Sequence, residues 1–80
     1  MRQMAVIRNV HVGGGDRGIP CLWFDTYISE SSGALQVIDW ETAGELLRKG
    51  NVYDVKELNG KPCWVEHDDN IIRFLELWTK

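Results

Sequence analysis

The sequence has few cysteines and few prolines, two of each among its 80 residues, and it contains no long apolar run. Two cysteines are too few for the disulfide framework of a small secreted domain, so we expect both thiols to be reduced. No stretch approaches the roughly 18 apolar residues of a membrane-spanning helix. The first ten residues lack the apolar core of a signal peptide, and we therefore expect cytoplasmic residence.

Basic residues are also scarce: nine Lys and Arg stand against twelve Asp and Glu, for a net charge of −3. The imbalance is concentrated between Asn9 and Leu47, where Arg17 is the single base. The acids of this region are Asp16, Asp25, Glu30, Asp39, Glu41 and Glu45. Proteins that bind nucleic acid usually carry a basic patch. The charge pattern therefore favours a cationic partner over nucleic acid.

The hydrophobic fraction, 44%, is sufficient for one small domain that spans residues 1–80. Runs rich in β-branched and aromatic residues predict strands at 4–12, 19–29, 34–40, 61–67 and 70–78. In the second strand, alternation predicts that Leu22, Phe24, Thr26 and Ile28 point inward. Trp23, Asp25 and Tyr27 then lie on the opposite face, as does Trp64 in the fourth strand.

Between residues 40 and 49 the apolar period changes, which predicts a helix with Ala43, Leu46 and Leu47 on one face. Asp39 is the expected N-cap, and Gly50 the expected left-handed stop. For residues 52–58 we favour a single helical turn over the alternative, a hairpin that turns at 59–60.

The element order is strand, strand, strand, helix, strand, strand. It predicts an α+β fold: a small five-stranded antiparallel sheet or an OB-like barrel. The core is predicted to contain Leu22, Phe24, Val37, Leu46, Leu47, Val65, Phe74 and Leu75.

Two Pro-Cys pairs, in "IPCLW" (19–23) and "KPCWV" (61–65), raise the question of metal or thiol chemistry. Cys63 and His67 are four residues apart on a predicted strand, hence about 13 Å apart, which one zinc ion cannot span. His11 and Cys21 are separated by a glycine loop. We expect no metal site, and two inert thiols beside apolar neighbours.

No pattern in the chain predicts catalysis or a cofactor. "GGGDRG" (13–18) matches a dinucleotide-binding glycine pattern, but a strand with Pro20 follows it where a helix would be needed. No serine has the surroundings of a nucleophile. We expect no enzyme activity, no catalytic residue and no cofactor.

Four tryptophans in 80 residues either fill the core or form an exposed binding face. The predicted partner-binding residues combine the outward aromatic side chains with the acidic region. They are Asp16, Trp23, Asp25, Tyr27, Glu30, Asp39, Glu41, Glu45 and Trp64.

The segments "GDRGIPCLWFDTY" and "VYDVKELNGKPCWVE" resemble a pattern of small phage and prophage accessory proteins. The resemblance is carried by the turn at residues 16–18 and by the L-x-G-K element at 58–61, and it implies a protein of a mobile element, often an inhibitor of host defence. The first hypothesis is therefore a non-enzymatic inhibitor that binds a host protein complex, in the manner of an anti-CRISPR protein. The alternatives are an OB-like binder of single-stranded nucleic acid and a structural, oligomer-forming phage protein, including a homodimer.

Overall fold

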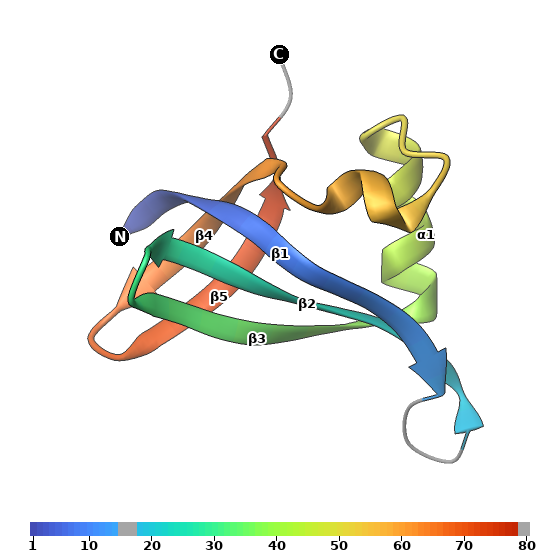
Figure 1. Cartoon of the computed structure of the whole chain (residues 1–80), viewed down its shortest axis with the longest axis horizontal. Coiled ribbons are helices and arrows are strands. Elements are labelled where there is room, and N and C mark those ends of the chain that lie inside the picture. Colours follow the sequence, from blue (N-terminus) through green and yellow to red (C-terminus); the bar gives the residue numbers. More distant parts are fainter. Residues whose placement is uncertain (15–17, 79–80) are drawn as a thin grey trace.

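The computed structural model describes residues 1–14 and 18–78 (Figure 1). The predicted element order is confirmed, and a short 3-10 helix, η2, precedes the fourth strand. The elements are β1 (Arg2–Gly14), β2 (Pro20–Ser29), β3 (Ser32–Asp39), α1 (Trp40–Lys49), η2 (Val55–Leu58), β4 (Pro62–Asp68) and β5 (Ile71–Leu77).

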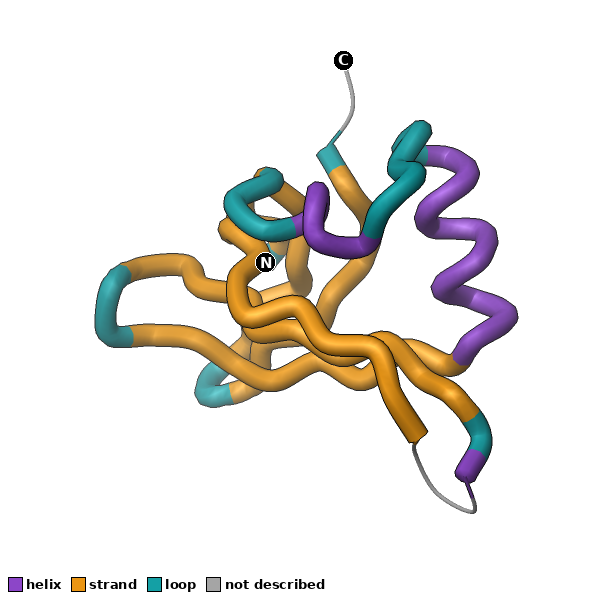
Figure 2. Tube along the Cα trace, turned by 45° about the vertical axis from the view of Figure 1, so that its right-hand side comes forward, coloured by secondary structure: helices purple, strands orange, loops and turns teal. Residues whose placement is uncertain are grey.

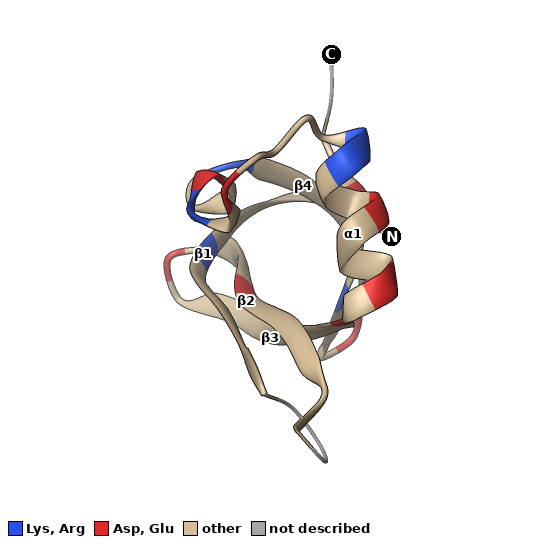
Figure 3. Cartoon of the chain, turned by 90° about the vertical axis from the view of Figure 1, so that its right-hand side faces the viewer, with Lys and Arg blue, Asp and Glu red and all other residues tan. Residues whose placement is uncertain are grey.

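The five strands form one antiparallel sheet in the order β3-β2-β1-β4-β5. Figure 3 shows that the sheet curls, with α1 beside its open side, and Figure 2 shows η2 and α1 at the same end of the sheet. The chain is thus an α+β protein with an OB-like half-barrel. The β2–β3 and β4–β5 connections are tight, since Ser29 pairs with Ser32 and Asp68 with Ile71.

The half-barrel is closed between β3 and β5 by a side chain instead of a backbone ladder. Gln36 of β3 donates from Nε2 to the carbonyl of Ile72 (2.8 Å), and its Oε1 accepts from the amide of Phe74 (3.0 Å). The same Nε2 also donates to the hydroxyl of Thr26 (3.2 Å). Gln36 is only 8% exposed. A buried amide is stable here because both its donor and its acceptor are satisfied.

The core lies inside the curled sheet and is covered by α1 and η2. Leu22, Phe24 and Thr26 are fully buried, as the alternation in β2 predicts. Phe24 packs edge-on against Phe74, with ring centroids 5.2 Å apart. The buried apolar residues are Ala5, Ile7, Leu22, Phe24, Ala43, Leu46, Val52, Leu58, Cys63, Val65 and Leu77.

Two of the predicted core residues are wrong. Val37 is 65% exposed, because β3 directs the neighbouring residues Gln36 and Ile38 inward. Leu75 is 40% exposed; it is absent from the register with β4, where a bulge opposite Trp64 and Val65 shifts the alternation of β5. Of the remaining predicted core, Leu47 and Phe74 are partly buried and pack against the buried cluster.

Helix α1 begins as predicted but ends differently. Asp39 caps it: its carboxylate accepts from the Thr42 amide (3.2 Å) and from the Thr42 hydroxyl (2.6 Å). Gly50 is not the left-handed residue, since its φ is −87°; Asn51 takes that conformation, with φ 54°. Gly50 lies close to β5, since a Cβ there would be 2.6 Å from Cδ1 of Leu77, so a larger residue would require the Leu77 side chain to move. No helix within the described ranges is long and apolar enough to cross a membrane.

The segment before β4 forms the favoured helical turn, not a hairpin. Asp54 accepts from the Lys56 amide (3.0 Å), which starts η2 at Val55. The turn after η2 then joins β1: the amide of Gly60, at φ 85°, donates to the carbonyl of Ile7 (2.7 Å). Leu58 of η2 is fully buried, so this turn belongs to the core.

Candidate functional site

Five side chains of β2 and β3 point away from the core and form what we call the hairpin face. They are Trp23, Asp25 and Tyr27 of β2 and Leu35 and Val37 of β3. Val37 pairs directly with Trp23, and Leu35 with Asp25. Leu35 and Val37 are 62% and 65% exposed. Together with the neighbouring Trp23 ring they form a contiguous apolar area, and such contiguous areas are a feature of interaction sites.

The aromatic rings of the hairpin face are fixed against the sheet. Trp23 stacks on His11, with centroids 5.7 Å apart, and its ring lies over Gly13, where a Cβ would be 3.1 Å from the ring. The ring of Tyr27 lies over Gly33, where a Cβ would be 2.6 Å away. Each ring therefore has a face already covered within the protein, and each holds its position without a ligand.

Asp25 lies between the two rings along β2, and a residue of β1 orients its carboxylate. Asn9 donates from Nδ2 to Oδ2 of Asp25 at 2.8 Å. Asn9 sits in the β1 bulge with φ 57°, a left-handed conformation that asparagine tolerates better than most residues. The bulge thus turns the Asn9 side chain toward β2 and fixes the carboxylate at the centre of the hairpin face.

Trp64 lies on the same outer side of the sheet, but on β4, with β1 between it and β2. The guanidinium of Arg2 lies 5.0 Å from its ring centroid and also pairs with Glu76 (3.1 Å). Trp64 is therefore covered by a cation of its own chain and stands apart from the hairpin face.

The structure divides the predicted acidic residues among different places. Glu30 is exposed in the turn between β2 and β3, at the end of the hairpin face. Asp39 caps α1, and its two hydrogen bonds with Thr42 lower the pKa of its carboxyl. Glu41 and Glu45 are exposed along α1, while basic residues occupy the last turn of that helix (Figure 3). Asp16 lies outside the described residues.

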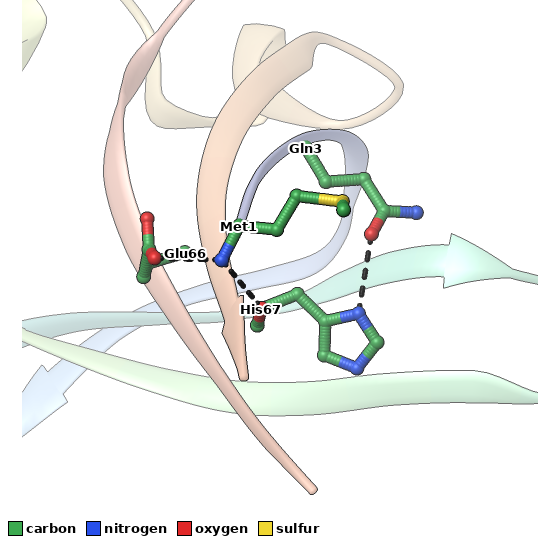
Figure 4. Close-up of polar contacts among 4 residues, drawn as sticks. All are labelled: Met1, Gln3, Glu66 and His67. Carbon is green, nitrogen blue, oxygen red and sulfur yellow. Dashed lines mark hydrogen bonds and ion pairs between the residues drawn. The ribbon is translucent and has the colours of Figure 1, made fainter. Parts of the chain in front are cut away.

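The polar contacts near the chain start involve β1 and β4 (Figure 4). The amino group of Met1 donates to Oε1 of Glu66 (2.8 Å) and to the carbonyl of His67 (2.9 Å). This ammonium group lowers the pKa of Glu66. Nδ1 of His67 lies 3.1 Å from Oε1 of Gln3. The His67 ring thus contacts the side-chain amide of Gln3, and it lies four residues along β4 from Cys63.

The two cysteines have different surroundings. Cys63 is fully buried, and burial raises the pKa of its thiol to about 11. Cys21 is half-buried, and both are free. Within residues 1–14 and 18–78, no three His, Cys, Asp or Glu side chains are placed to hold a metal ion.

Sequence reasoning missed Leu35, Asn9 and the surface role of Val37. The segment at 34–38 has apolar residues on both faces, so alternation alone does not say which of them is exposed. The bulge at Asn9 follows from pairing with two neighbouring strands, a long-range property. The sequence did offer one signal for the bulge: Asn9, a residue that tolerates a positive φ, lies within the run predicted as the first strand.

No protein-family model, curated protein or solved structure matches this chain. The resemblance to phage accessory proteins therefore stays a prediction.

Proposed function

We propose that this protein acts by binding a partner protein through the hairpin face. The observation that carries the proposal is the exposed pair Leu35 and Val37, set beside two fixed aromatic rings. Aromatic side chains are enriched at the centre of protein interfaces, and the exposed aliphatic pair beside the rings enlarges the apolar area that a partner can bury. Because the rings are held without a ligand, binding loses little conformational entropy there.

The charge around the hairpin face indicates the partner's character. From Pro20 to Asp39 the chain has no Lys or Arg, and it carries Asp25, Glu30 and the helix cap Asp39; Arg8 of β1 is the base beside Asp25. The matching surface is apolar opposite Leu35 and Val37 and basic opposite Asp25 and Glu30, and basic side chains of this kind line the nucleic-acid groove of many proteins. Occupation of such a groove would make this chain an inhibitor. That is the use implied by its resemblance to phage accessory proteins.

The test is affinity capture from a bacterial host lysate, followed by calorimetry with the purified partner. The variant Leu35→Ser/Val37→Ser should lose capture. The matched control is Ile71→Ser, because Ile71 is 62% exposed on β5, outside the hairpin face. Both variants should keep the circular dichroism spectrum of the parent protein. Unchanged capture by the double variant would refute the proposal.

A second candidate is binding of single-stranded nucleic acid, favoured by the OB-like half-barrel. OB folds bind oligonucleotides on the strand 2–3 face, where this chain has Trp23 and Tyr27. The nearest base in the ladder is Arg8, the cross-strand neighbour of Asp25. Titration with a labelled single-stranded oligonucleotide separates the two candidates. Tight, salt-dependent binding that Trp23→Ala weakens would favour nucleic acid, and absence of binding at low salt would favour the protein partner.

A further inference from the structure

A second surface, away from the hairpin face, lies between α1 and the end of β5. It is a groove of about 370 Å³ with charged and polar side chains of the helix on one wall and strand residues on the other. Leu46 and Leu77, both nearly buried, contribute its apolar floor. The helix wall comprises Thr42, Glu45, Leu46, Lys49 and Gly50, and the strand wall comprises residues 74–77.

The strand wall is an open edge of the sheet. β5 is the last strand in the order β3-β2-β1-β4-β5, so β4 pairs with one side of it. On the other side, Gln36 bonds to Ile72 and Phe74, and among the described residues no ladder continues toward Leu77. Leu75, at the bulge between β5 and β4, lines the groove on this side and is 40% exposed. An open strand edge presents amide and carbonyl groups that another extended chain can pair with.

The helix wall carries one charge of each sign, at a spacing that matches a strand. Glu45 and Lys49 are four residues apart, hence about 6 Å along the helix axis. Residues i and i+2 of an extended peptide are about 6.7 Å apart and point to the same side. A peptide with a base and an acid at i and i+2 therefore complements both charges at once.

We propose that this groove binds an extended peptide segment of a partner protein, which adds a strand to the edge of β5. The segment has a basic and an acidic residue two positions apart, toward Glu45 and Lys49. Its alternate residues are apolar and lie over Leu46 and Leu77. The geometry of an edge strand beside a helix selects an extended backbone, and the charges select the sequence and direction of the peptide.

The experiment uses two fluorescein-labelled peptides of identical composition: Val-Lys-Val-Glu-Val-Thr and Val-Glu-Val-Lys-Val-Thr. Binding to the full chain is followed by fluorescence anisotropy and by the NMR amide shifts of residues 74–77. We expect one isomer to bind about fivefold tighter, from two rim charge pairs. In the double variant Glu45→Lys/Lys49→Glu the preference should pass to the other isomer.

The matched control is Glu41→Lys/Arg48→Glu, the same charge exchange on residues of α1 that do not line the groove. It should leave the preference unchanged. N-methylation of the peptide backbone provides a second control, because alternate amides of a strand face opposite sides. Methylation of the amides that face β5 should weaken binding about tenfold, and methylation of the amides that face away should have little effect.

Equal binding of both isomers, no binding of either, or the same effect from the control exchange would overturn the proposal. Concentration-dependent dimerisation that Glu45→Lys/Lys49→Glu abolishes would overturn it too, since the groove would then hold a second copy of this chain. None of these results bears on Leu35 and Val37, so the two proposals fail independently.

Discussion

The side chain of Gln36 pairs with the backbone of Phe74 as a strand would: the Phe74 amide donates to Oε1 at 3.0 Å, and Nε2 donates two residues back, to Ile72. One buried amide thus joins the two edge strands of the half-barrel. The contact between β3 and β5 is therefore made by a side chain, whereas neighbouring strands of most sheets are joined by backbone hydrogen bonds.

Gln36→Leu should destabilise the protein by about 1–3 kcal/mol, because it leaves the Phe74 amide and the Ile72 carbonyl without their partner. Urea unfolding followed by circular dichroism measures the loss. The neighbouring Val37→Ala, at an exposed position, should change the free energy of unfolding by less than about 0.5 kcal/mol. Equal stability of the two variants would show that the seam is held by other contacts.

Leu58→Ala should cost about 2–5 kcal/mol, because Leu58 is fully buried although it lies in a four-residue 3-10 helix. Leu47→Ala should cost less, since Leu47 is only partly buried. Thermal unfolding of both variants checks the order. If Leu47→Ala were the more damaging change, η2 would not be part of the cooperative core.

The thiols should react in sequence with a disulfide reagent at pH 8. Cys21, half-buried, should react first, and Cys63 should react only on unfolding, because burial raises the pKa of its thiol from 9.0 to about 11. The raised pKa favours the neutral thiol in the folded state. Its contribution to stability is therefore complete below pH 9 and is lost as the pH rises toward 11. Cys63→Ala should abolish that part of the pH dependence, and a fast second thiol in the parent protein would contradict the assignment.

Asp39→Ala should lower the melting temperature at neutral pH, whereas Asp39→Asn should largely keep it, because asparagine also caps helices. The hydrogen bonds from Thr42 lower the pKa of Asp39 below its ordinary 3.8, so they favour the charged form. The stabilisation is thus present above pH 3.8 and is lost as the pH falls through the lower, folded-state pKa. Thermal unfolding between pH 2 and pH 7 should show a shallower acid loss for Asp39→Asn than for the parent.

The period-2 and period-3.6 patterns were sufficient for most of the fold. Leu22, Phe24 and Thr26 alternate with polar or aromatic residues, so their inward direction could be predicted. In β3, Leu35 and Val37 are as apolar as the inward Ile38, and the prediction of Val37 in the core implied that the polar Gln36 would face outward. Its burial depends on groups of β5, thirty-six residues away, that no local pattern reports.

The candidate site was predicted only in part. Trp23, Asp25 and Tyr27 are brought together because they are alternate residues of one strand. Glu41 and Glu45 belong to the same acidic region of the sequence, but they lie along α1, beyond the end of β3. Trp64 shares the outer side of the sheet but is engaged by Arg2. The direction of α1 relative to the sheet decides which acidic residues lie beside the aromatic ones. The amino-acid composition does not determine that direction.

The place of β1 in the middle of the sheet has a consequence for the order of folding. β1 is first in the chain, and it pairs with β2 at once but with β4 only after residues 62–68 are available. During synthesis, a three-stranded meander can therefore form first, with one side of its opening strand unsatisfied. The last hairpin must then pair with a strand about sixty residues earlier in the sequence, a non-local step that is slow compared with the pairing of neighbouring strands. Until then, nascent chains are at their most vulnerable to mispairing with one another.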